Sequence, residues 1–171
     1  WSVAMKLVIL LLVVMVIGCA STSKEKKAQP TTPKTTGVKI REIKPLTKEE
    51  SAKVIEAAIR KAAEKPTGEL TKADFEKVTG LPLGNNQLTS VKGLEKLTKL
   101  EVLYLNYNQL TNVKGLENLT QLKNLYLRDN QLSDVKGLEK LNQLETLYLR
   151  DNQLTDVKGL EKLTQLMVLS L

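Results

Sequence analysis

The residue types that usually carry enzymatic chemistry are scarce in this chain. Among its 171 residues there is no His, and Cys19 is the only Cys. These absences exclude a Cys/His zinc site, a Ser-His-Asp or Cys-His catalytic group and an intrachain disulfide. Aromatic residues make up 4% of the sequence, too few for a surface that stacks single-stranded nucleic acid. We therefore expect no metal and no other cofactor, and we predict that the protein is not an enzyme.

Carboxylates are the remaining candidates for acid-base chemistry. Asp129 and Asp151 occupy equivalent positions 22 residues apart, but each directly follows an Arg, Arg128 or Arg150. This neighbourhood favours ion pairing at the surface over proton transfer.

Cys19 is a candidate for a different reaction, the acylation of a thiol. Lys6 precedes an unbroken apolar run over 7–17, which as a helix would rise only about 16 Å and is too short to span a bilayer. A positive start and a short apolar run are typical of an export signal. Residues 16–19 (VIGC) resemble the lipobox of bacterial lipoproteins. That resemblance implies that a signal peptide, 1–18, is removed and that Cys19 is lipidated; an ordinary signal peptide is the alternative.

The stretch after Cys19 is rich in Ser, Thr, Lys and Pro, so we expect a disordered tether over 19–45. The formal net charge of the chain is +7, but residues 81–171 contribute only +1, because their Lys residues are interleaved with Glu and Asp. Nucleic-acid binding needs Lys and Arg clustered on one face. We therefore predict no nucleic-acid partner.

Residues 46–80 have the pattern of a helical cap. Thr47 and Glu50 are spaced as an N-terminal capping box. Apolar residues then recur at helical spacing: Val54, Ile55, Ala58, Ile59 and Ala62. The stretch 65–68 (KPTG) is expected to end this helix.

A second, shorter helix is predicted over about 72–77, with Thr71 as its N-cap. It contains Phe75, the only Phe of the chain. We expect Phe75 to fill a place in the core.

From residue 81 onward, apolar residues recur every 22 positions. One column consists of Leu81, Leu103, Leu125, Leu147 and Leu169, and six further columns keep the same step. Because one coil of chain cannot bury seven apolar side chains alone, stacked coils must share a continuous core. The Leu-x-Leu alternation in each period predicts a short strand with both Leu inward and the middle residue outward. Neighbouring strands are expected to lie parallel, about 4.8 Å apart.

Residues 100–110 (LEVLYLNYNQL) resemble the pattern L-x-x-L-x-L-x-x-N-x-L of the leucine-rich repeat family. The 22-residue period is similar to the short bacterial class of internalins, and residues 57–61 and 68–74 look like the helical cap before such repeats. The resemblance implies an α/β solenoid, a horseshoe with a parallel concave sheet, 3₁₀ and loop segments on the convex side and an N-terminal helical cap. The domains expected are the cap over 46–80 and about four and a half repeats over 81–171.

Two polar columns mark the bends of each repeat, and we interpret both as structural. The first follows each strand, where a buried amide can satisfy backbone groups in its own coil and the next: Asn86, Asn108, Asn130 and Asn152. The second precedes a Leu-x-x-Leu-x-x-Leu spacing suited to a 3₁₀ segment: Gly93, Gly115, Gly137 and Gly159.

Function is expected at positions that the scaffold does not dictate, the outward residues of the concave sheet. Six of these are predicted to bind a protein partner: Tyr104, Asn106, Tyr126, Arg128, Tyr148 and Arg150. Tyr and Arg are enriched at binding hot spots. Tyr107, where the next two repeats have Asp, extends the aromatic patch. The alternative is that stacked Tyr only stabilise the sheet surface.

The predicted function is that of a lipid-anchored, extracytoplasmic protein of the bacterial cell envelope, facing the periplasm or the exterior. It would act as a protein-protein interaction or adhesion module, and it would touch the membrane through the lipid on Cys19. The repeats stop within the fifth strand without a cap, so we expect the full protein to continue with more repeats. The alternative is an N-terminal fragment of a larger envelope enzyme or sensor, whose active domain lies beyond residue 171.

Overall fold

Five three-residue strands form one sheet in the computed structural model, which describes residues 44–171. The expected signal peptide (1–18), Cys19 and all but the end of the expected tether (19–45) lie outside the described residues. The elements are, in chain order, α1 (Lys48–Ala62), α2 (Lys72–Glu76), β1 (Gly80–Pro82), β2 (Val102–Tyr104), η1 (Leu116–Asn118), β3 (Asn124–Tyr126), β4 (Thr146–Tyr148), η2 (Leu160–Lys162) and β5 (Val168–Ser170), where η denotes a 3₁₀ helix. Within residues 44–171 neither helix has the length and hydropathy needed to cross a bilayer.

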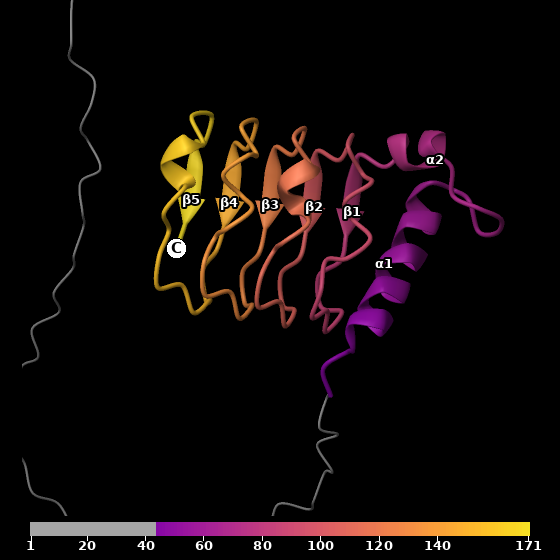
Figure 1. Ribbon diagram of the computed structural model, residues 1–171, viewed down its shortest axis with the longest axis horizontal. Helices are drawn as coiled ribbons and strands as arrows, with labels where there is room; N and C mark the ends of the chain where they lie inside the picture. The colour runs from indigo at the N-terminus through magenta and orange to yellow at the C-terminus, as the bar shows by residue number, and fades with distance from the viewer. Residues whose placement is uncertain (1–43) are drawn as a thin grey trace, which may run out of the picture. The chain divides into compact units, whose positions relative to one another are not determined.

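The strands pair in parallel and follow one another in the order β1-β2-β3-β4-β5 (Figure 1). Each residue lies beside the residue one period later: Leu81 pairs with Leu103, and Leu103 with Leu125. Every sequence column therefore becomes a ladder of neighbouring side chains. This parallel sheet of stacked coils confirms the predicted solenoid.

The leucine columns form the core between the sheet and the returning loops. Both Leu of each Leu-x-Leu are fully buried in β2 and the residues that follow it, as are their counterparts around β3 and β4. Burial falls off at the last coil, where Val157 is 39% exposed and Leu169 44% exposed. A coil thus depends on both neighbours to cover its apolar side chains.

The asparagine column bonds adjacent coils together. The Nδ2 of Asn130 donates to the carbonyl oxygens of Leu127 (3.0 Å) and Leu105 (2.9 Å), and its Oδ1 accepts from the backbone N–H of Leu110 (3.1 Å). Asn108 makes the same three kinds of bond one coil earlier. The amides were expected to reach their own coil and the next, but they reach their own and the preceding one, because the Asn follows its strand and its amide points back along the stack.

The glycine column marks the second bend with a left-handed backbone. Gly115 and Gly159 have φ of 112° and 106°, and each begins a 3₁₀ helix, η1 or η2. The equivalent segments after the other two Gly are turns rather than 3₁₀ helices. In each bend a Glu two residues later accepts from the Gly N–H, as Glu117 does from Gly115 at 2.6 Å. Bonds from its own and the Gly115 backbone N–H groups lower the pKa of Glu117.

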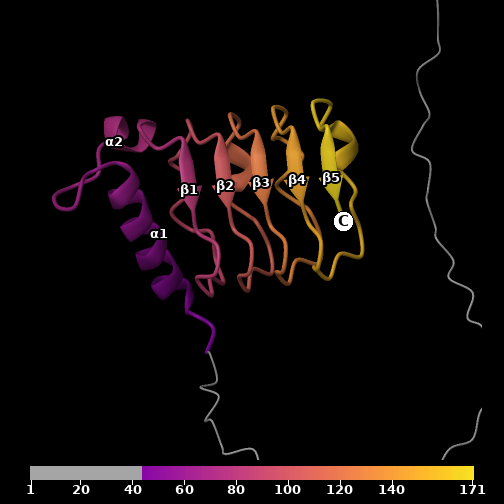
Figure 2. The same cartoon turned by 180° about the vertical axis from the view of Figure 1, so that it is seen from behind.

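The two helices lie beside β1 (Figures 1 and 2), and α1 packs on the first strand. The capping box of α1 is present as predicted: the Thr47 side chain accepts from the Glu50 N–H, and Glu50 accepts from the Thr47 N–H at 2.7 Å. Ile55 and Ile59 are buried in the core, at 0% and 2% exposed. The end of the apolar stripe differs from the prediction, since Ala62 is exposed and Ala63 is buried.

The second helix is also capped as predicted, since the Thr71 side chain accepts from the Asp74 N–H. Phe75, however, does not fill the core. It is half-buried at the rim, where the Lys96 ammonium lies 5.5 Å from the ring centroid. Val78, at 1% exposed, is the residue of this segment that reaches the core.

Replacing Asn130 with Ala should lower the free energy of unfolding by about 2 kcal/mol, because the buried N–H of Leu110 loses its acceptor. The carbonyl groups of Leu105 and Leu127 each lose one of two amide donors and keep the one from the Asn of a neighbouring coil. Asn142, which is exposed, is the matched control, and its change to Ala should cost no more than about 0.5 kcal/mol. Urea denaturation of both variants measures the difference. Equal losses in the two variants would show that the asparagine ladder does not hold the coils together.

Candidate binding face

Three tyrosines from successive strands stack on the outer side of the sheet. Tyr104 of β2, Tyr126 of β3 and Tyr148 of β4 point outward because the Leu on either side of each points inward. The ring centroids of Tyr104 and Tyr126 are 4.7 Å apart at an interplanar angle of 8°. Those of Tyr126 and Tyr148 are 5.4 Å apart at 15°. We call these three residues the tyrosine ladder, and the outward side of the sheet the tyrosine face.

The ladder both stabilises the sheet and remains accessible. Each stacked pair adds a favourable aromatic contact between neighbouring strands. Burial raises the pKa of the Tyr126 hydroxyl, and the neighbouring tyrosines raise it further, so this hydroxyl stays protonated and can donate a hydrogen bond. Tyr104, at one end of the ladder, is 42% exposed. The structural and the binding interpretation of the tyrosines are therefore compatible.

Arg128 is held in place beside the ladder by two carboxylates. Its Nε lies 2.9 Å from Oδ2 of Asp129 and 3.1 Å from Oδ2 of Asp151. The pKa of Arg128 is raised, chiefly by its interaction with Tyr107 and also by these two Asp residues. The contacts confirm the surface ion pairing expected for Asp129 and Asp151.

The side chain of Arg150 is more exposed than that of Arg128 and is held by a weaker ion pair. Its side chain is 64% exposed, and its Nε lies 3.6 Å from Oδ2 of Asp151, which Arg128 already engages at 3.1 Å. Such an exposed, long ion pair contributes little to stability. Arg150 can therefore turn toward a ligand at small cost.

Asn106 makes a structural contact, and its predicted role in binding stays a prediction. Its Oδ1 accepts a hydrogen bond from the backbone N–H of Arg128 at 2.9 Å, so its amide ties two neighbouring coils together. Of the six predicted binding residues, the three tyrosines form one continuous ladder and the two arginines lie one column away. Asn106 begins that same column, but its acceptor oxygen is already engaged.

Tyr107 has an unusual backbone conformation that the sequence did not predict. It has φ of 56°, in the left-handed region, and its counterparts with the same conformation are Asn85, Asp129 and Asp151. Asn and Asp tolerate this conformation, whereas a bulky Tyr is strained there. The residue is 48% exposed, and the Arg128 guanidinium carbon lies 5.8 Å from the centroid of its ring. The signal in the sequence was a Tyr in a column otherwise filled by Asn and Asp.

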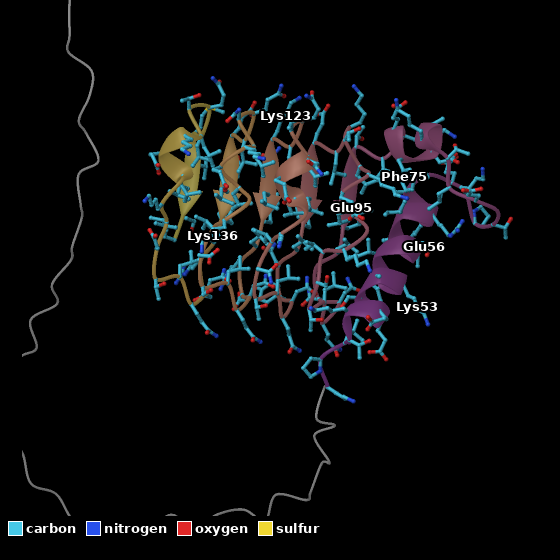
Figure 3. All side chains as sticks on the ribbon, viewed as in Figure 1. Lys53, Glu56, Phe75, Glu95, Lys123 and Lys136 are labelled. Atoms are coloured by element: carbon cyan, nitrogen blue, oxygen red, sulfur yellow. The ribbon has the colours of Figure 1, made fainter. Side chains whose placement is uncertain are left out.

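A hollow outside the tyrosine face lies between α1, the α2 segment and the first coil, with a volume of about 380 Å³. Figure 3 labels Glu56, Phe75 and Glu95, three of its lining residues. Arg60 pairs with Glu56 at 2.8 Å, and Lys96 covers Phe75, so charged side chains of this rim engage their own neighbours. No group of three His, Cys, Asp or Glu side chains within 44–171 is placed to hold a metal ion. The tyrosine face is the stronger candidate for a site.

Replacing Tyr126 with Ala should destabilise the fold by about 1 kcal/mol more than replacing Tyr104, because the middle ring stacks on two neighbours and the end ring on one. Urea denaturation of the two variants gives the comparison. Equal losses would show that stacking on a second ring adds nothing to the stability of the fold.

The sequence matches the family model for leucine-rich repeats (2 copies) over residues 77–118, 98–140 and 120–162. No curated protein matches it. One similar solved structure is an internalin, InlF, from Listeria monocytogenes, with 34% identity, a TM-score of 0.65 and coverage of 68% of this chain and 35% of that chain. Another is internalin C2 from the same organism, with 35% identity, a TM-score of 0.63 and coverage of 66% and 50%.

A third similar structure is a leucine-rich repeat protein from Leptospira interrogans, with 37% identity, a TM-score of 0.55 and coverage of 60% of this chain and 28% of that one. This chain thus spans half or less of the length of each of these three proteins. The overlapping family matches run through four of the stacked coils, and the in-register parallel sheet is the geometry that such repeats require. The chain belongs to the leucine-rich repeat family and is similar to internalins of the short-repeat class.

Proposed function

We propose that this protein is a lipid-anchored module of the bacterial cell envelope that binds another protein through its tyrosine face. The observation that carries the proposal is the tyrosine ladder, a row of large aromatic side chains on the solvent side of a sheet whose other side is the core. Solenoids of this kind offer extended binding surfaces. Tyr combines a large contact area with a hydroxyl group, which is why it is common at protein interfaces.

The surroundings of the ladder support recognition rather than catalysis. Arg128 and Arg150 bring charged hydrogen-bond donors to one side of the rings, and Tyr107 adds a further exposed aromatic side chain. The acidic groups near them, Asp129 and Asp151, are engaged by these arginines. In this arrangement the carboxylates orient the arginines, and the aromatic rings supply contact area.

The anchoring half of the proposal rests on the sequence alone. In this proposal, residues 1–18 are a lipoprotein signal peptide and Cys19 carries the lipid anchor. Residues 19–45 are a tether that holds the folded part away from the membrane. The helices over 46–80 would cap the repeats over 81–171. Acyl chains on Cys19 would give stable attachment, because more than one chain is needed to hold a protein on a bilayer.

A photo-crosslinking amino acid placed at Tyr104 should join the protein to a discrete partner in living cells, because this side chain is 42% exposed on the tyrosine face. The products are separated by gel electrophoresis and identified by mass spectrometry. Lys136 is the matched control: its side chain is 87% exposed, and it lies on a loop outside the sheet (Figure 3). Cross-linking that is equally strong from Lys136, or absent from Tyr104, would contradict binding through this face.

Replacing Cys19 with Ala should abolish metabolic labelling of the protein with palmitate and move it from the membrane fraction to the soluble fraction, since the chain has no other thiol to acylate. Replacing Ala20 with Ser, beside the anchor position, should leave both properties unchanged. Palmitate labelling that survives in the Cys19→Ala variant would show that the anchor lies elsewhere.

A further inference from the structure

We propose that the element bound by the tyrosine face is an amphipathic α-helix of the partner, lying across the strands and along the axis of the solenoid. This inference rests on the proposed function and names the kind of structure that the face would recognise. It follows from the spacing of the ladder, the separation of its charged edges and the charges on them.

The spacing of the ladder matches the pitch of an α-helix. Neighbouring rings are 4.7 and 5.4 Å apart, and an α-helix rises about 5.4 Å per turn. A partner helix along this axis therefore places one of its turns beside each ring. Its apolar side chains at positions i, i+4 and i+7 would each contact one tyrosine. The length of two helical turns differs from the length of the two steps of the ladder by less than about 1 Å.

Extended ligands fit this spacing less well. In a bound β-strand, side chains on one face recur about every 6.7 Å. If the first such side chain contacts Tyr104, the second therefore falls between the rings of Tyr126 and Tyr148. A polyproline helix repeats about every 9.3 Å and would meet Tyr104 and Tyr148 but leave Tyr126 without a matching contact. The helix is the regular structure that meets all three rings.

The width of the face also suits a helix. One edge is formed by the residues just before the strands, Glu101, Lys123 and Glu145, of which Figure 3 labels Lys123. The other edge is formed by Arg128 and Arg150, just after the strands. Glu145 and Arg150 are five steps apart along an extended chain, or about 16 Å. A helix with its side chains is about 10–12 Å wide, which fits between the two edges.

The charges define which helix would fit. The strip between the edges is uncharged and consists of the ladder with Val102, Asn124 and Thr146. On the first edge, Lys123 pairs with Glu101 at 3.0 Å. Glu145 takes part in no ion pair within residues 44–171, so it is the carboxylate of this edge that a partner could engage. On the second edge Arg150 is the more exposed cation, at 64%. A complementary helix has an apolar stripe with a basic residue on one flank and an acidic residue on the other.

Tyr107 would fix where the helix begins. It follows β2 on the same edge as Arg128, half-exposed, and its strained left-handed conformation is of the kind that persists at functional sites. An aromatic contact there adds to one end of the bound helix only. The five strands, about 4.8 Å apart, span about 19 Å, the length of a helix of about 13 residues.

The test uses the full chain in mild detergent and two displayed libraries of 14-residue peptides. One library is held helical by a side-chain staple on its outward face, and the other is kept extended by Pro at every third position. Binders that lose at least tenfold affinity for the Tyr104→Ser and Tyr148→Ser variants, measured by fluorescence anisotropy, are expected from the helical library, with apolar residues at i, i+4 and i+7.

The possible failures separate the two proposals. Ladder-dependent binders from the extended library alone would overturn the helix while leaving protein binding through the tyrosine face standing. If neither library gives a binder that depends on the ladder, both proposals fail. Circular dichroism of each variant confirms that the fold is retained.

A charge exchange tests the orientation without touching the core or the ladder. Arg150→Glu should weaken a helical binder with an acidic flank about tenfold, and exchanging that acidic residue for Lys in the peptide should restore its affinity. The exposed Arg150 side chain can be changed without loss of folding. Equal affinity of both peptides for both proteins would overturn the proposed placement of the helix.

Discussion

The structure depends on one constraint: each 22-residue coil can bury its leucines only against the coils on either side. The exposure of Leu169 and Val157 in the last coil, against complete burial of their counterparts in the middle coils, shows how strongly each coil relies on its neighbours. Stacking also brings backbone groups inside, away from water, where an unpaired polar group is costly. The asparagine amides meet that need by bonding to two coils at once, so apolar burial and polar satisfaction impose the same register.

Once the register is set, the outward columns become ladders whether or not a partner exists. Identical side chains are brought within about 5 Å of one another, which suits flat rings that can stack and disfavours like charges. The tyrosine column uses this arrangement directly. In the next column, two arginines lie one coil apart, and their repulsion is offset by Asp151, whose Oδ2 lies within 3.6 Å of both. The scaffold thus limits which side chains a binding face can carry.

The sequence predicted the features that have a local pattern, and it missed the contacts that depend on how separate segments pack. The leucine columns, the capping box at Thr47 and the outward tyrosines follow from local patterns that recur or have fixed spacing, and the structure has all of them. The rim position of Phe75 could not be predicted, because it depends on how α2 meets the first coil and no repeated pattern reports that contact. The hydrogen bond that the Arg128 N–H donates to the Asn106 side chain likewise depends on the three-dimensional register of two coils. The strain at Tyr107 becomes visible only when its φ is known.

A perfectly periodic face has a weakness as a binding site, because a periodic ligand could slide along it by one coil and make the same contacts again. Specific recognition therefore needs side chains that interrupt the period. In this chain the interruptions lie at both ends of the ladder: Pro82 and Ser170 replace Tyr in the ladder column, and Tyr107 replaces Asp or Asn beside it. Arg128 and Arg150, in the column begun by Asn106, give the face a direction along its axis. The regular columns supply contact area, and the irregular positions define a single register, so selectivity would reside in the few residues that the repeat does not explain.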